Sequence, residues 1–175
     1  MCSSDLEGGI RGIRFTVGDP KTAVVSIDMI EPLAKRIAEY GWHIQLNMPC
    51  DKIVEHADML RRLPTQLVFD HLGKPPENEG IQHPSHAIIR SLLDARRAWV
   101  KISGAYMNTL VGPPGYEDAT RVAQAFVQAN PDRLVWGSDW PHPSPKVKPD
   151  DAILFDLLTT DRKSTPSELQ SPCNL

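Results

Sequence analysis

Short apolar segments that alternate with helical stretches constrain the fold of this chain more than any other feature. Five segments are rich in Ile, Val, Leu, Phe and Trp: residues 12–17, 42–48, 66–70, 99–103 and 133–138. Each is followed by a stretch whose apolar residues have helical spacing: residues 27–40, 51–63, 84–97, 118–129 and 149–158. Nearly continuous apolar character is typical of strands that are buried on both faces. The repeated strand–helix unit predicts parallel strands joined by right-handed crossovers, and therefore an α/β domain.

Two α/β architectures fit this order, an open doubly wound sheet and a closed (β/α)8 barrel. Polar residues follow several of the predicted strands: Asn47, His71, residues 103–106 and residues 138–142. In a barrel these strand ends open onto one face and surround one substrate. An open sheet binds nucleotides through a Gly-rich turn, and neither GxGxxG nor GxxxxGK[ST] occurs. We therefore expect a (β/α)8 TIM-barrel type of fold.

The number of strands predicts that this barrel is incomplete. A closed barrel of this type needs eight strands, and the sequence suggests about five carboxyl-terminal β/α units. We expect the amino-terminal third to be missing. MCSSDL differs in character from the RGIRF that follows, so we interpret residues 1–10 as a non-native leader and residues 11–158 as the partial barrel domain. Residues 159–175 lose periodicity and become rich in Ser, Thr and Pro, which predicts an irregular, frame-shifted or disordered tail.

Charge and composition argue against several classes of function. The 175 residues carry a formal net charge of -3 and no stripe of Lys and Arg, so we expect no nucleic-acid partner. No long apolar run and no secretory pattern occur, which predicts a cytoplasmic protein without membrane contact. The three cysteines, Cys2, Cys50 and Cys173, have no CxxC spacing and are expected to be reduced thiols.

The segment RLVWGSDWPHP contains the strongest candidate for catalysis. Asp139 comes at the end of a buried strand, where a carboxylate can act as a metal ligand or a general base. An Asp that only caps the next turn would give the same pattern. In VFDHLGKP, His71 also follows a strand, and a neutral imidazole there can polarise a carbonyl or hold a metal. A structural, hydrogen-bonded histidine is the alternative for His71.

Several weaker candidates could bind a substrate. Arg14 in GIRF could meet a carboxylate with two hydrogen bonds, or pair with a neighbouring acid. Tyr106 and Ser103 in KISGAY could donate hydrogen bonds to a lactone or carboxyl oxygen, although a turn also explains them. His83 and His86 are interpreted as capping or exposed residues at a helix start.

The remaining candidates rest on their place relative to the predicted strands. His43 and Gln45 lie two residues apart on one predicted strand and so share a face, which in a barrel is either the lumen or the helix layer; polar residues suit the lumen better. Asn47 follows the same strand, and His142 lies between two prolines after the last one. Trp140 could stack on a ligand, or simply pack at a strand end.

With GIRF, FDHLGKP, WVKISGAY and RLVWGSDWPHP in this order, the chain resembles the amidohydrolase-related family of the amidohydrolase superfamily. It looks most like the lactonase branch, which acts on pyrone dicarboxylates and sugar-acid lactones. The resemblance implies a metal-dependent-hydrolase barrel with a His-x-His pair after its first strand, a His after a middle strand and an Asp after the eighth. The last two correspond to His71 and Asp139, and His-x-His is absent from this sequence.

The resemblance implies an enzyme that opens or isomerises a carboxylated lactone. Asp139 would be the general base, His71 would polarise the carbonyl, and Arg14 with Tyr106 or Ser103 would anchor the substrate carboxylate. Many superfamily members use one or two divalent metals and the lactonase branch can work without one, so zinc or manganese on His71 and Asp139 is an open possibility. Pyrone-dicarboxylate hydrolases of this branch carry further basic residues just downstream of GIRF, where this chain has Gly18, Asp19 and Pro20. The resemblance therefore favours a sugar-acid lactone with one carboxylate over a dianionic pyrone.

Two alternatives to a lactonase remain open at this point. Decarboxylases of the same superfamily, which act on unsaturated or aromatic acids, share the late-strand Asp. An inactive fragment is the other alternative, because a five-stranded open sheet leaves unpaired edges and uncovered apolar surface.

Overall fold

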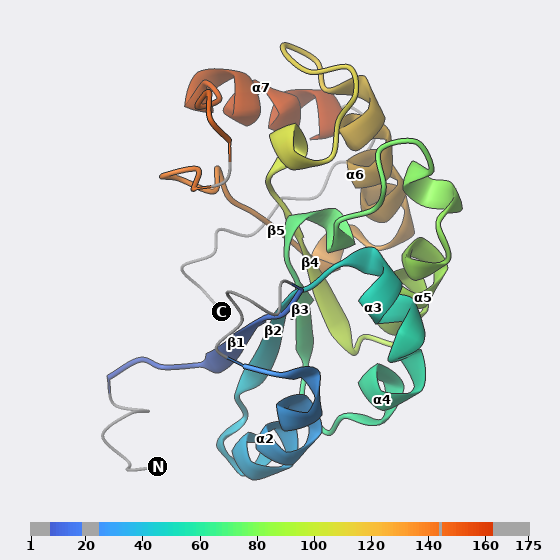
Figure 1. Cartoon of the computed structure of the whole chain (residues 1–175), viewed down its shortest axis with the longest axis vertical. Coiled ribbons are helices and arrows are strands. Elements are labelled where there is room, and N and C mark those ends of the chain that lie inside the picture. Colours follow the sequence, from blue (N-terminus) through green and yellow to red (C-terminus); the bar gives the residue numbers. More distant parts are fainter. Residues whose placement is uncertain (1–7, 19–24, 144, 163–175) are drawn as a thin grey trace.

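The computed structural model describes residues 8–18, 25–143 and 145–162. For residues 158–162 it describes the backbone alone. Its strands are β1 (Gly12–Thr16), β2 (His43–Asn47), β3 (Leu67–Phe69), β4 (Ala98–Ile102) and β5 (Leu134–Trp136). They form one parallel sheet in the order β1-β2-β3-β4-β5 (Figure 1). Neighbours in sequence are thus neighbours in the sheet, as expected for consecutive β/α units of a barrel.

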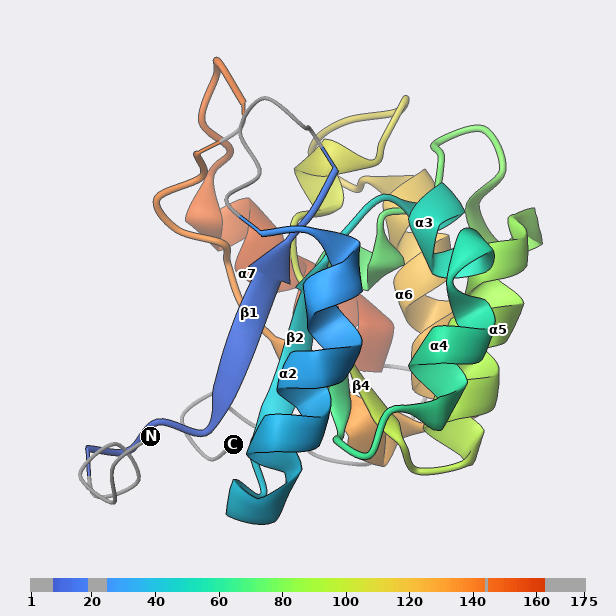
Figure 2. The ribbon, with the colours of Figure 1, turned by 60° about the horizontal axis from the view of Figure 1, so that its bottom comes forward.

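Helices connect the strands and cover one face of the sheet. They are α2 (Ile30–Ile37), which is extended by short 3-10 turns on both sides, α3 (Cys50–Glu55), α4 (Ala57–Arg62), α5 (Pro84–Asp94) and α6 (Glu117–Ala129). A further helix, α7 (Asp151–Arg162), follows β5. Figure 2 shows α2 to α6 on the same side of the sheet. Within the described residues, none of the helices combines the length and apolar character needed to cross a bilayer.

Strand alternation separates an apolar face from a polar one. One row of the register joins Phe15, Leu46, Phe69, Val100 and Leu134, all of which are at most 1% exposed and pack against the helices. The next row on the opposite face joins Arg14, Gln45, Val68 and Trp99. Polar side chains on this second face are therefore separated from the apolar core by the sheet itself.

The predicted elements are all present, with boundaries that local turns change. The helix expected over residues 51–63 is divided at His56, whose φ of -107° and ψ of 19° are not helical. The helix expected to reach residue 97 ends at Asp94, before Arg96 adopts a φ of 56°. Helix α7 continues to Arg162, so the segment expected to be irregular, 159–175, begins within it. Most of the expected leader, residues 1–7, and residues 163–175 lie outside the described residues, as do Cys2 and Cys173.

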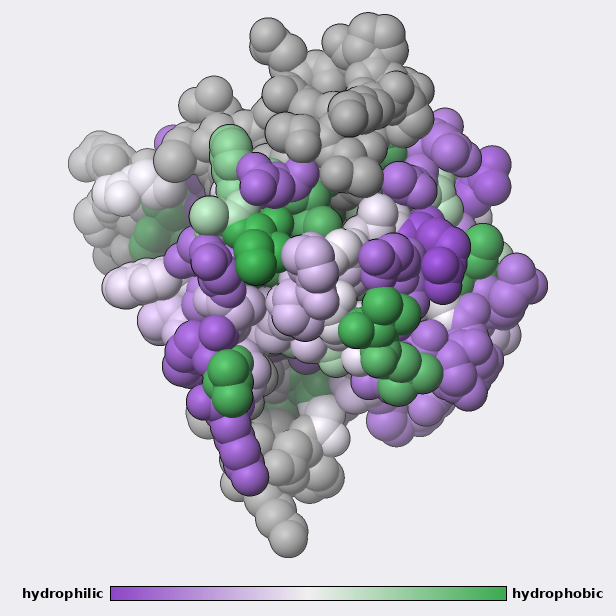
Figure 3. All heavy atoms as spheres, turned by 90° about the horizontal axis from the view of Figure 1, so that it is seen from above, coloured by the Kyte–Doolittle hydropathy of each residue, from purple (hydrophilic) through white to green (hydrophobic). Residues whose placement is uncertain are grey.

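Exposed apolar side chains are spread over the surface. Those with large exposure include Leu110, Val111, Trp140, Val147 and Phe155. On the face seen in Figure 3, hydrophobic residues form separate patches between hydrophilic ones. The exposed apolar side chains therefore do not form one continuous docking surface on that face.

Candidate functional site

Polar residues from three strand ends meet at the carboxyl edge of the sheet. His71 follows β3, Ser103 and Tyr106 follow β4, and Asp139 follows β5. Their backbone is unusual, because His71 has a φ of 51° and Asp139 a φ of 69°. A non-glycine residue in this region costs of order 1–3 kcal/mol, and such residues cluster at functional sites. The fold therefore holds the backbone of these two residues in strained conformations at a shared edge.

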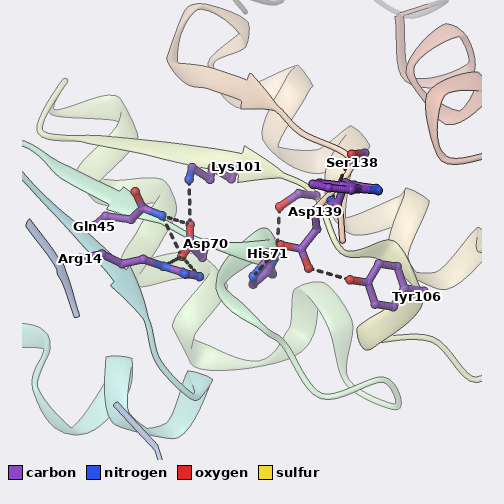
Figure 4. A network of polar contacts seen from close by, with 10 residues as sticks. Arg14, Gln45, Asp70, His71, Lys101, Tyr106, Ser138 and Asp139 are labelled. Atoms are coloured by element: carbon purple, nitrogen blue, oxygen red, sulfur yellow. Dashed lines mark hydrogen bonds and ion pairs between the residues drawn. The ribbon is translucent and has the colours of Figure 1, made fainter. Parts of the chain in front are cut away.

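His71 and Asp139 face each other, and each has a second partner (Figure 4). His71 Nε2 lies 3.8 Å from Asp139 Oδ1, and Tyr106 donates its hydroxyl hydrogen to Asp139 Oδ2 at 2.6 Å. On the other side of the imidazole, His71 Nδ1 lies 3.0 Å from Ser103 Oγ. A hydroxyl both donates and accepts, so this contact permits either tautomer of His71. We call these four residues the His71–Asp139 site.

Burial sets the charge states within this site. It lowers the pKa of His71, although Asp139 and Asp70 oppose that shift, so the imidazole is neutral near pH 7. The pKa of Tyr106 is raised by burial and by its hydrogen bond to Asp139, which keeps the phenol protonated as a donor. An oriented carboxylate can abstract a proton, and a neutral imidazole beside it can polarise a carbonyl.

A glycine fixes the position of the His71 ring. Gly104 has a φ of 66°, and a Cβ at this residue would lie 2.8 Å from His71 Nδ1. Both the backbone conformation and the space thus exclude a larger residue without rearrangement.

A second polar group lies beside this site and is organised by Asp70 (Figure 4). The Asp70 side chain is 1% exposed and accepts hydrogen bonds from Arg14 Nε at 2.9 Å and from Gln45 Nε2 at 2.8 Å. Lys101 Nζ lies 3.4 Å from the same carboxylate. We call Arg14, Gln45, Asp70 and Lys101 the Asp70 cluster. It links β1, β2 and β4 to the end of β3 and carries one more positive than negative charge.

The cluster changes the interpretation of Arg14 and reveals residues that the sequence analysis missed. Arg14, expected to hold a substrate carboxylate, already pairs with Asp70, while its side chain remains 47% exposed. Asp70 and Lys101 were not candidates, although a charged lysine within an apolar strand was a usable signal. Lys74 was also missed: it lies near Asp70 and Asp139, and burial lowers its pKa.

The structure separates the other candidates. Asn47 ends β2 at the carboxyl edge, and its buried Oδ1 has no hydrogen-bond partner among the described residues. His43 begins β2, at the opposite end of the strand, where its ring packs against Gly12. Trp140 follows Asp139 and is 75% exposed.

His142 and the two histidines expected at a helix start have local partners. His142 is 3% exposed, with its Nε2 2.9 Å from Asp151 Oδ1 and its ring edge-on to that of Tyr106. It therefore links the ring of Tyr106 to Asp151 at the start of α7. His83 caps α5 by accepting from Ser85 N, as expected for a capping residue. His86 packs against Phe126.

His71 and Asp139 fit part of a metal site. A separation of 3.8 Å between Nε2 and Oδ1 is compatible with one ion at the 2.0–2.2 Å distances that zinc prefers. In the described part of the chain, the group of three close candidate ligands is a different one, formed by Cys50, Asp51 and His83. The described residues supply two ligands at the His71–Asp139 site, which is fewer than a catalytic zinc normally has.

A parallel β/α sheet in sequential strand order, with a histidine and an aspartate at its carboxyl edge, places the chain in the class of (β/α)-barrel folds. Residues 5–170 match the family model described as Amidohydrolase, and the chain belongs to that family. The predicted family and the incomplete (β/α)8 fold class are thereby confirmed.

Named relatives agree with the lactonase branch. The chain is 31% identical over 161 residues to 2-pyrone-4,6-dicarboxylate hydrolase of Comamonas testosteroni, covering 87% of this chain and 53% of that protein. It is 30% identical over 154 residues to 4-sulfomuconolactone hydrolase of Rhizobium radiobacter, covering 86% and 51%. An apo structure from Agrobacterium tumefaciens is 27% identical with a TM-score of 0.78, covering 95% of this chain and 60% of that one. The chain thus spans about half the length of the curated relatives it matches.

Proposed function

We propose that this protein hydrolyses a carboxylated lactone, with Asp139 as the general base. The observation that carries the proposal is the orientation of the Asp139 carboxylate. One of its oxygens accepts the Tyr106 hydroxyl at 2.6 Å, and the other faces the neutral His71 imidazole at 3.8 Å. The names of two relatives, a pyrone-dicarboxylate hydrolase and a muconolactone hydrolase, support a lactone as the substrate class.

The reaction begins with a proton transfer to Asp139. Water bound between the carboxylate and the substrate gives a proton to Oδ1 while its oxygen attacks the lactone carbonyl carbon. With the Ser103 hydroxyl donating to Nδ1, His71 carries its proton on Nε2 and donates it as a hydrogen bond to the oxyanion that forms. The ring C–O bond then breaks, and the leaving alkoxide takes the proton from Asp139. The product is the open hydroxy acid, and the base is restored.

Positive charge beside the site favours an anionic substrate. Arg14 and Lys101 together exceed the charge of Asp70, and Lys74 adds another cation near Asp139. These cations are suited to hold the carboxylate of a sugar-acid lactone. The exposed Trp140 lies at the same edge, and the buried Oδ1 of Asn47 can accept a hydrogen bond from a substrate hydroxyl. A zinc or manganese ion on His71 and Asp139 would polarise the carbonyl further when bound.

Turnover of a lactone panel in isotopically labelled water tests the proposal. We expect the chain to open sugar-acid lactones and to place one oxygen of H2-18O in the product carboxylate. An isomerase using a substrate hydroxyl as nucleophile would give a lactone without label, and a decarboxylase would release carbon dioxide. The absence of any label in the product carboxylate across the panel would overturn the proposal.

A further inference from the structure

A second group of ligand-type side chains lies where the turn after β2 meets the loop before α5. Cys50 is the first residue of α3, Asp51 is the second, and His83 is the residue that caps α5. The Cys50 sulfur, an Asp51 carboxylate oxygen and a His83 ring nitrogen all lie within 4.8 Å of one another. None of the three has a role in the proposed lactone chemistry.

The atoms of this group match the donor preference of zinc. Zinc binds thiolate, imidazole and carboxylate at about 2.0–2.3 Å, which places tetrahedral ligand atoms roughly 3.3–3.8 Å apart. His83 Nε2 and Asp51 Oδ1 already lie 3.2 Å apart. Cys50 and His83 are buried, whereas the Asp51 side chain is 86% exposed and can move toward an ion from the solvent side. The three ligand atoms lie within 4.8 Å of one another, so closing the remaining separations to about 3.3–3.8 Å would complete three ligands and leave a fourth position for water.

The Ser85 hydroxyl orients the His83 imidazole through its second ring nitrogen, Nδ1. Ser85 is 1% exposed, and its Oγ lies 2.9 Å from His83 Nδ1. Histidine ligands usually donate a hydrogen bond from their second nitrogen, which fixes the ring and the tautomer. Without an ion, Nδ1 accepts from Ser85 N and Nε2 donates to Asp51. With an ion on Nε2, Nδ1 carries the proton and donates it to Ser85 Oγ.

Acidic groups surround the Cys50 thiol. Burial is the main cause that raises its pKa, and the carboxylates of Asp51 and Glu79 raise it further. The same negative surroundings attract a divalent cation, which would displace the thiol proton and bind the thiolate. The raised pKa opposes formation of the free thiolate near neutral pH, so the case for the site rests on the geometry of its ligands and on the negative charge around it.

We propose that Cys50, Asp51 and His83 bind a zinc-type divalent ion that ties the start of α3 to the start of α5. These helices already pack against each other. The loop from β3 to α5 carries His71 and Lys74, so the ion would stabilise the segment that holds one side of the His71–Asp139 site.

Cobalt, which replaces zinc and is coloured, provides the direct test. The chain with Cys2→Ser and Cys173→Ser is titrated with Co2+, so that Cys50 is its one thiol. We expect a thiolate-to-cobalt charge-transfer band that saturates at one equivalent and disappears with Cys50→Ser. Asp51→Asn, at an exposed position, and His83→Asn, which keeps a good capping residue, should each weaken Co2+ binding at least tenfold. Ser85→Ala should weaken it by about 10–100-fold.

Two controls separate this site from the catalytic one. Asp139→Asn should leave the band and its affinity unchanged, and Zn2+ should raise the midpoint of thermal unfolding except with Cys50→Ser. Absence of the band, or a band that Asp51→Asn and His83→Asn do not weaken, would overturn the proposal. Loss of the band with Asp139→Asn would likewise overturn it, because the Cys50 site would then not bind the ion independently of the His71–Asp139 site.

Discussion

Replacing Gly104 with alanine tests how the backbone positions His71. The new methyl group would lie 2.8 Å from His71 Nδ1 and 3.2 Å from the Met107 sulfur. The φ of 66° at this residue costs an alanine about 1–2 kcal/mol before any clash is counted. Met107 is flexible enough to give way, but the ring is held between Ser103 and Asp139 and must shift. A displacement approaching 1 Å at a catalytic group reduces turnover by about 100-fold.

Gly41 provides a matched control for this substitution. It also has a φ of 66°, and nothing lies within 4 Å of the position that its Cβ would occupy. Gly41→Ala should therefore lose about 1–2 kcal/mol of stability and no turnover. Gly104→Ala should lose at least as much stability, and in addition about 100-fold in kcat.

Urea unfolding and initial rates of lactone opening measure the two effects separately. The difference in kcat between Gly104→Ala and Gly41→Ala isolates the contact with His71, since the backbone cost is shared. Equal turnover in the two variants would refute the conclusion that Gly104 sets the position of this imidazole.

Three further substitutions probe the neighbouring contacts. Tyr106→Phe removes the hydrogen bond to Asp139, worth about 1.5–3 kcal/mol for a charged acceptor, so kcat/KM should fall about 10–100-fold while Tyr40→Phe leaves it unchanged; equal rates would exclude a role for this hydroxyl. Asp70→Asn leaves Arg14 and Lys101, which are 47% and 29% exposed, without their carboxylate and should lower the free energy of unfolding by about 1.5–3 kcal/mol, measured in urea against Asp58→Asn at an exposed position. Burial lowers the pKa of His86, so the unfolded chain takes up its proton first as the pH falls below about 6.5. Stability should then decline on acidification, and His86→Leu should reduce that slope by up to about 1.4 kcal/mol per pH unit; an unchanged slope would contradict the linkage.

The repeated units of the fold could be predicted because their signal is local. Apolar runs define the five strands, and helical spacing defines the segments between them. The break at His56 and the early end of α5 depend on single backbone conformations, at His56 and Arg96, that periodicity does not specify. Element types were therefore predictable, and several boundaries were not.

The candidate site was predictable where strand order alone decides proximity. His71 follows β3 and Asp139 follows β5, on either side of β4 in one parallel sheet, so both lie at its carboxyl edge as the topology requires. His43 and Asn47 lie on the same face of β2, but the four-residue step between them spans about 13 Å. Alternation therefore predicted which face His43 occupies, but not that it lies at the end of the strand away from the His71–Asp139 site. The Asp70 cluster needs the register of four strands, which no single segment of sequence contains.

The rate of lactone opening by Asp139→Asn, beside Asp58→Asn, tests the central claim most directly. Asparagine keeps the shape of the side chain and its contact with Tyr106, but it cannot take a proton from water. With Asp139 as the general base, kcat should fall by about 100- to 10,000-fold while the Kd for the lactone changes little, and Asp58→Asn should behave like the parent chain. Turnover by Asp139→Asn within a few-fold of the parent rate would contradict the account.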